Sequence, residues 1–232
     1  MIKNQHTLAL DWQTQALGRY STCAYHLPVD DQGHYHPLPS QGQLQDSTEQ
    51  VHIHLLQPDA AKEPHYATLN ATEQRQAQRF KFAKDRKLYA AAHHFVRTTL
   101  SRYADIDPTD WAFRNNDYGK PSIINPGYTG LDYNLSHTQG MVAIAVTRQR
   151  AIGVDTEQAH PLNDLTSLSR SVFADPEYAD VIAGTGRDQQ QRFFTYWTLK
   201  EAYIKARGMG LSIPTPTISF YRWHSTAVAF TV

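Results

Sequence analysis

Two acidic residues, Asp155 and Glu157, stand two positions apart in the segment IGVDTE, which covers residues 152–157. Side chains two apart on a β-strand point to the same side, so a strand here would direct both carboxylates toward one point. Two like charges held this close repel each other unless a cation lies between them. Acidic pairs are also common at the ends of ordinary strands, so the pair alone is only a weak sign of a metal site.

A second group lies in the segment WTLKEAYIKA, residues 197–206, which is followed by GMGL at 208–211. On a helix, Trp197, Glu201 and Lys205 are successive i, i+4 positions, so an aromatic ring, a carboxylate and an ammonium share one face. The same pattern also fits an exposed Glu–Lys pair of small energy on a helix that stops at a glycine. The helix becomes a functional candidate only in combination with the two carboxylates of the strand.

Two further segments could supply groups that bind phosphate. Ser136 and His137 leave an expected strand, where a hydroxyl, an imidazole and backbone N–H groups can donate to an anion. They do not form a convincing nucleophile and base, because adjacent side chains on an extended chain diverge. Lys120 stands in the tight turn Tyr-Gly-Lys-Pro at 118–121. Taken singly, each is explained equally well by an ordinary loop histidine or a basic turn.

The elements that must position these residues follow from hydrophobic periodicity and turn residues. Strands are expected over residues 51–56, 132–135, 141–147, 152–157, 218–221 and 227–232. Helices are expected over residues 71–103 with a break near 80–85, and over 164–173, 176–182 and 187–207. Residues 28–50 and 115–121 are expected to form loops. The order strand, helices, strand occurs twice, which favours an α+β fold of two lobes.

The composition narrows the class of protein. The 232 residues include 22 basic and 22 acidic side chains, and this neutral balance argues against a general nucleic-acid or membrane binder. The single cysteine, Cys23, cannot form an intrachain disulfide. No segment has the pattern of a signal peptide or a membrane span, so we expect a soluble cytoplasmic protein. Residues 1–49 are rich in Gln and His, and we expect the histidines His26, His34 and His36 to be solvated in loops.

The four segments also occur in a recognisable order: YGKP, NLSH, GVDTE and finally WxxKExxxKAxGxGL. This ordered set closely resembles the surfactin-type (Sfp-like) 4′-phosphopantetheinyl transferase superfamily, and the last two motifs are the specific ones. The similarity spans roughly residues 51–220 and does not cover the N-terminal segment. The resemblance implies a pseudo-dimer of two similar α+β lobes, with the active site in the cleft between them.

The resemblance implies a role for each motif residue. The carboxylates of Asp155, Glu157 and Glu201 would gather around Mg²⁺, with Mn²⁺ as the alternative ion, which suits the preference of Mg²⁺ for hard oxygen ligands. Glu201 is the candidate general base, and Lys205 is the candidate for stabilising the transition state. The residues implied to contact coenzyme A phosphates are Lys120, Ser136, His137, Lys200 and Lys205.

The first lobe departs from the family pattern. Glu73 and Gln76 stand where relatives often carry basic residues for the 3′-phosphate, so Arg75 and Arg79 are the candidates to replace them. Glu177 matches a further family glutamate and is expected near the metal without contacting it.

The implied reaction transfers 4′-phosphopantetheine from coenzyme A, the co-substrate, to a serine of an apo acyl or peptidyl carrier protein, and releases 3′,5′-ADP. The expected organisation is an N-terminal extension (1–49), a first lobe (50–149) and a second lobe (150–232) in a monomer, with neither nucleic acid nor membrane as partner. Two alternatives remain open: a coenzyme A or carrier-binding module without turnover, and an unrelated metal-dependent phosphate ester hydrolase.

Overall fold

The computed structural model describes residues 10–11, 20–23, 51–58, 66–128, 130–148, 151–224 and 227–231. Within these ranges the fold is α+β, with helices packed on antiparallel sheets, as predicted. The helices are α1 (Ala71–Gln78), α2 (Ala83–Leu100), α3 (Leu165–Val172), α4 (Asp175–Ala183) and α5 (Gly186–Arg207). The strands are β1 (Leu10–Asp11), β2 (Tyr20–Cys23), β3 (Val51–Leu56), β4 (Phe113–Asn115), β5 (Pro121–Ile123), β6 (Leu131–Thr138), β7 (Met141–Arg148), β8 (Asp155–Gln158), β9 (Ser219–His224) and β10 (Ala227–Thr231).

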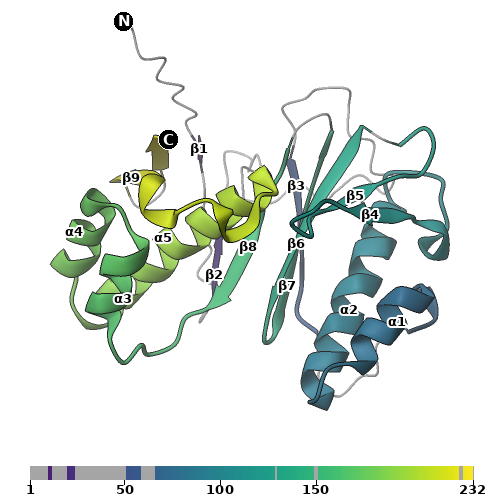
Figure 1. The fold of residues 1–232 in the computed structure, drawn as a ribbon, viewed down its shortest axis with the longest axis horizontal. Coiled ribbons are helices and arrows are strands. Elements are labelled where there is room, and N and C mark those ends of the chain that lie inside the picture. The colour runs from purple at the N-terminus through teal and green to yellow at the C-terminus, as the bar shows by residue number, and fades with distance from the viewer. Residues whose placement is uncertain are drawn as a thin grey trace, which may run out of the picture.

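We call residues 51–148 the first half and residues 151–231 the second half. They occupy opposite sides of the molecule in Figure 1, with α1 and α2 in one and α3, α4 and α5 in the other. Each half has its own large cluster of buried apolar side chains. The break expected near 80–85 separates α1 from α2, and a capping box between Asn70 and Glu73 starts α1.

The sheet of the first half has the order β3-β7-β6, with every pair antiparallel. Its central strand β7 is buried on both faces, which explains its unbroken apolar sequence. Ile144 and Val146 belong to the core under α2. The small residues Ala143 and Ala145 face the other way and pack against Val154, just before β8. A small third core therefore joins the two halves.

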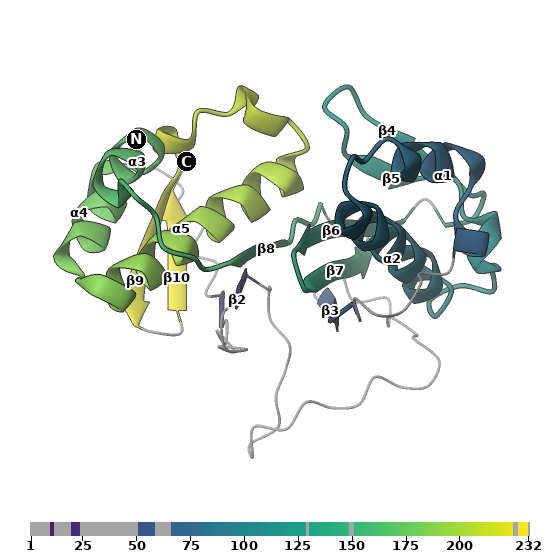
Figure 2. The ribbon, with the colours of Figure 1, turned by 90° about the horizontal axis from the view of Figure 1, so that it is seen from below.

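The second half is built around α5, whose 22 residues supply most of its buried core. The helix ends at Gly208, which has a φ of 62° in the left-handed region that suits glycine. Figure 2 shows β8 running between α5 and the sheet of the first half.

Two short strands from the N-terminal segment also lie in the second half. β1 pairs with β10, and β2 pairs antiparallel with β8, where Ser21 is opposite Glu157 and Cys23 opposite Asp155. The sequence predicted neither strand. The expected histidine loops and most of residues 1–49 lie outside the described residues, as does the predicted lobe boundary at 149–150.

Two elements differ from the prediction. The expected loop at 115–121 is the tip of a hairpin formed by β4 and β5. The expected strand at 152–157 begins only at Asp155, because residues 152–154 run against α5 instead of pairing with a strand. A Cβ at Gly153 would lie 1.9 Å from the carbonyl oxygen of Ala202, so only glycine permits this approach. No helix in the described part of the chain is long and apolar enough to cross a bilayer.

Candidate active site

Side chains of β6 hold the segment that leads into β8. The Oδ1 of Asn134 accepts a hydrogen bond from the Val154 amide at 2.9 Å, and the Oγ of Ser136 accepts one from the Thr156 amide at 3.2 Å. The two side chains share a face of β6 because they are two residues apart. Both are buried, so the carboxylate strand is fixed to the sheet of the first half by side chains.

Ser136 also reaches the charged groups. Its hydroxyl donates to Oδ1 of Asp155 at 2.9 Å and accepts from Nζ of Lys205 at 2.9 Å. A hydroxyl has one donor and two acceptor lone pairs, and these two bonds plus the Thr156 amide use all three. Ser136 was predicted to contact coenzyme A phosphates, but here its hydroxyl is fully engaged by the protein. The hydroxyl thereby positions Asp155 and Lys205, and the phosphate contact of Ser136 stays a prediction.

The strand and helix motifs meet, as the sequence predicted. Nζ of Lys205 lies 2.6 Å from Oδ1 of Asp155, whose side chain is only 5% exposed. The other oxygen of this carboxylate, Oδ2, is buried and has no hydrogen-bond partner in the described structure. A buried carboxylate oxygen without a partner is costly, and this one lies beside two more acidic residues.

Those two residues are Glu157 and Glu201, both half-buried. Desolvation and the charge of Asp155 raise the pKa of each carboxyl above its ordinary value, and the charge of Glu157 adds to the effect on Glu201. A hydrogen bond from the Trp197 side chain acts in the opposite direction on Glu157. The charges of the three carboxylates therefore act on one another where β8 meets α5.

These groups match the chemistry of a hard divalent cation. Among the described residues, no three His, Cys, Asp or Glu side chains already stand in the geometry of a metal site. Lys205 occupies one oxygen of Asp155, while the oxygen Oδ2 of the same carboxylate still lacks a partner. Carboxylate oxygens are hard ligands of the kind that Mg²⁺ takes, and one oxygen of Asp155 has no partner among the described residues.

His137 lies at the end of β6 and is open to solvent. Partial desolvation, His93 and Lys205 lower its pKa. His93 comes from α2 and is hydrogen-bonded to Glu73 through Nδ1 at 3.2 Å. The sequence analysis missed His93, because it scored α2 only for apolar periodicity. A histidine one helical turn before a buried arginine, Arg97, was the available signal.

The structure does not bring Lys200 into this group. The lysine is 0% exposed, and its ammonium lies 2.7 Å from Oε2 of Glu177, which is also 0% exposed. The other two donors go to the carbonyl oxygens of Thr215 and Ile218, so all three N–H groups are used. Glu177 serves as the buried partner of Lys200, and the expected phosphate contact of Lys200 stays a prediction.

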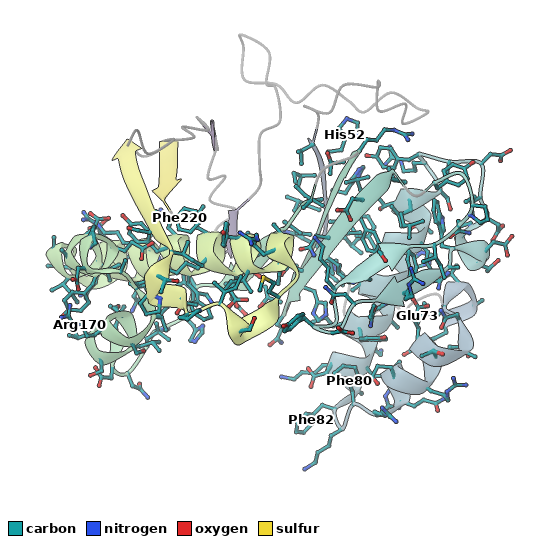
Figure 3. The ribbon with its side chains drawn as sticks, turned by 45° about the horizontal axis from the view of Figure 1, so that its top comes forward. His52, Glu73, Phe80, Phe82, Arg170 and Phe220 are labelled. Atoms are coloured by element: carbon teal, nitrogen blue, oxygen red, sulfur yellow. The ribbon has the colours of Figure 1, made fainter. Side chains whose placement is uncertain are left out.

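Three other predicted residues lie apart from the carboxylates. Lys120 donates to the carbonyl oxygens of Ile152 at 3.1 Å and Ala206 at 2.9 Å. Arg75 on α1 and Arg79 just after its end are exposed, and each donates to a side chain three residues earlier in the sequence. Glu73 is buried at the position where a basic residue was sought, with Nε of Arg97 at 2.9 Å (Figure 3).

Comparisons with known proteins agree with the motif resemblance. A family model described as the 4′-phosphopantetheinyl transferase superfamily matches residues 151–232, and one described as 4′-phosphopantetheinyl transferase, N-terminal, matches residues 59–149.

Individual relatives cover both halves. The chain is 36% identical over 180 residues to the 4′-phosphopantetheinyl transferase HetI of Nostoc sp., a match that covers 75% of this chain and 76% of that protein. It is 34% identical over 124 residues to the 4′-phosphopantetheinyl transferase Sfp of Bacillus subtilis, covering 53% of each. A phosphopantetheinyl transferase of Thraustochytrium sp. is 30% identical over 173 residues, with 70% of this chain and 60% of that protein covered. The resemblance predicted from the motifs is thus confirmed, and this chain belongs to the 4′-phosphopantetheinyl transferase superfamily.

Proposed function

We propose that this chain transfers the 4′-phosphopantetheine arm of coenzyme A to a serine of an apo acyl or peptidyl carrier protein and releases 3′,5′-ADP. One observation carries the proposal. In a member of this superfamily, Asp155, Glu157, Glu201 and Lys205 meet where β8 crosses α5, and a buried oxygen of Asp155 has no partner among the residues that the structure describes. Membership favours transfer over the two alternatives, a binding module and a phosphate ester hydrolase.

We propose that Asp155, Glu157 and Glu201 hold Mg²⁺ and that Mn²⁺ can replace it. The support is the oxygen-only donor set and the unsatisfied Oδ2 of Asp155. When bound, the ion would neutralise charge on the pyrophosphate of coenzyme A.

The chain's own residues account for the remaining steps. The serine oxygen of the carrier forms a bond to the β-phosphorus of coenzyme A, and the bond from that phosphorus to the bridging oxygen of the pyrophosphate breaks. Glu201 is the proposed acceptor of the serine proton, directly or through water. Lys205 is held by Ser136 and Asp155 at the edge of the carboxylate group, where its ammonium can stabilise charge on the leaving 3′,5′-ADP. His137 and His93 are proposed to face the phosphates of coenzyme A.

We propose two similar lobes, 50–149 and 150–232, with the active site in the cleft between them. The two separate cores support the division, and so do the two family models, which meet at residues 149 and 151. One chain supplies the site from both sides, since Asn134 and Ser136 come from the first half and the acidic residues from the second. This favours a monomer.

Intact-mass spectrometry of apo carrier proteins tests the reaction. Carriers from fatty-acid, polyketide and non-ribosomal peptide synthesis would each be incubated with the protein, coenzyme A and Mg²⁺. We expect a mass gain equal to one phosphopantetheine arm, lost with EDTA and with Glu201→Gln. Asp188→Asn is the matched control, because it makes the same change on an exposed turn of α5.

The other outcomes separate the alternatives. Binding of coenzyme A without a mass gain on any carrier would favour the binding module. Release of phosphate from coenzyme A in the absence of carrier would favour the hydrolase.

A further inference from the structure

The tip of the β4–β5 hairpin in the first half reaches across to α5. The tip is pre-organised by its own hydrogen bonds, because Oδ1 of Asn116 accepts from the amides of Tyr118 at 3.0 Å and Lys120 at 2.9 Å. Gly119, with a φ of 88°, completes the turn. The side chains of Asn116 and Lys120 are therefore presented together on one side.

Both side chains bind the end of α5. Nζ of Lys120 donates to the carbonyl oxygen of Ala206 at 2.9 Å, and Nδ2 of Asn116 donates to that of Gly208 at 2.7 Å. The last carbonyl groups of a helix have no partner within the helix, and the negative end of its dipole favours a cation. The Gly208 amide already caps the carbonyl groups of Ile204 and Lys205, and the first half adds side-chain partners for those of Ala206 and Gly208.

Lys120 also holds the segment that leads into β8. It donates to the carbonyl oxygen of Ile152 at 3.1 Å, while the amide of Ile152 donates to the carboxylate of Asp132. Both polar groups of the Ile152 backbone are therefore held by side chains of the first half. Burial lowers the pKa of Lys120 and raises the pKa of Asp132, and the charge of each group opposes this shift in the other.

Gly208 leaves room for this arrangement. A Cβ at this position would lie 2.9 Å from Cδ of Lys120 and 3.1 Å from Nδ2 of Asn116. A side chain there would displace both groups from the helix end, in addition to the strain of its positive φ.

Lys120 holds the end of α5 and the segment that leads into β8, and these two elements carry the residues of the candidate active site. Lys205 lies in the last turn of α5, next to Ala206, and Asp155 lies three residues after Ile152. We propose, building on the proposed transferase function, that Lys120 is a positioning residue that fixes α5 against β8 and so sets the distance between Lys205 and Asp155. Asn116 assists it at the helix end. This role differs from the contact with coenzyme A expected from the family pattern.

Steady-state kinetics separate the two roles. We expect Lys120→Met to lower kcat about tenfold or more, with the KM for coenzyme A changed by less than about threefold, because small displacements of catalytic groups cost rate. Asn116→Ala should lower kcat in the same way but less, and the double variant should lose less than the product of the two effects, because both act through one contact. Lys120→Arg should recover part of the rate, since a guanidinium can also donate to two carbonyl oxygens. Arg114→Met is the matched control, as an exposed basic residue of the same hairpin.

Hydrogen exchange gives a readout that does not require catalysis. Lys120→Met should speed amide exchange over residues 205–210 relative to wild type, with α2 unchanged as the internal standard. An unchanged kcat with a strongly raised KM for coenzyme A would overturn the proposal in favour of a direct contact, and so would unchanged exchange over 205–210. If Lys120→Met fails to fold, Asn116→Ala and Lys120→Arg provide the same two measurements. Absence of transfer by the wild-type protein would count against the proposed function alone, since the exchange measurement would still test Lys120.

Discussion

Helix α5 carries two lysine–carboxylate pairs whose surroundings differ sharply. Lys200 and Glu177 are both 0% exposed, and every donor of the lysine is used. Lys205 is 29% exposed, and its partner Asp155 keeps one buried oxygen that has no partner within the described part of the chain. The two ion-pair distances, 2.7 Å and 2.6 Å, are nearly the same.

The difference lies in what each pair leaves unsatisfied. The carboxylate of Glu177 also accepts from the backbone amides of Phe220 and Ala174. The Glu177–Lys200 pair therefore joins α4, α5 and β9, and all of its charged groups have hydrogen-bond partners. The Asp155–Lys205 pair has room for a further cation or anion. A buried pair whose hydrogen-bonding groups are all used (a saturated pair) stabilises the fold. A pair at the edge of the core with an unused group (an unsaturated pair) is available to bind a ligand or take part in a reaction.

Breaking the saturated pair should have the largest effect. We expect Lys200→Met to lower the free energy of unfolding by about 3–5 kcal/mol, because the Glu177 carboxylate would remain buried without its cation. Urea denaturation would measure this change. If stability stayed within about 1 kcal/mol of wild type while affinity for coenzyme A fell, Lys200 would be a phosphate ligand after all.

Lys205→Met tests the unsaturated pair by the same substitution on the same helix. We expect kcat for transfer to fall by about 10²–10³-fold, the range for removing one group that stabilises a transition state. The free energy of unfolding should fall by less than it does for Lys200→Met, because only one member of this pair, Asp155, is buried. A large loss of stability with normal kcat would show that the Asp155–Lys205 pair stabilises the fold and does not serve the reaction.

A buried polar cluster without an ion pair extends the comparison to pH. His54 bonds the Tyr103 hydroxyl at 2.6 Å, and desolvation, with the charges of Arg102 and His52, lowers its pKa from 6.5 to about 4. Between these values the unfolded chain binds a proton that the folded chain does not, so stability should fall as pH drops from 6.5 toward 4. The loss should approach about 3 kcal/mol.

Urea denaturation at pH 7 and pH 5 would detect this dependence. His54→Gln should flatten the difference between the two pH values, and His160→Gln, at an exposed histidine, should leave it as in wild type. A wild-type protein equally stable at both values would show that His54 does not titrate in this way.

The smallest effect is expected for an exposed pair. Arg170 lies 3.0 Å from Asp175, with 63% and 89% of their side chains exposed (Figure 3). Arg170→Ala should change stability by less than about 0.5 kcal/mol, because solvent screens such pairs. A larger loss would point to the contact of its guanidinium with the Tyr178 ring.

Periodicity and turn residues were enough to place the five helices within a few residues of their observed bounds. The expectation that Asp155 and Glu201 lie near each other came from the family resemblance and not from periodicity. Periodicity could not predict which charged side chains pair with one another. Lys200 and Lys205 are equivalent in a motif, and only packing decides which one meets Glu177. The strands β1 and β2 were missed because such short segments gain their structure from the strands they pair with.

The pairing of β2 with β8 has a consequence for how the site is made. Cys23 and Asp155 are far apart in the chain, so the strand that bears two of the carboxylates cannot gain this neighbour on the ribosome until well over half of the protein has been synthesised. Contacts of such long sequence separation form slowly. We therefore expect the sheet of the first half to fold early and the carboxylate junction to mature last.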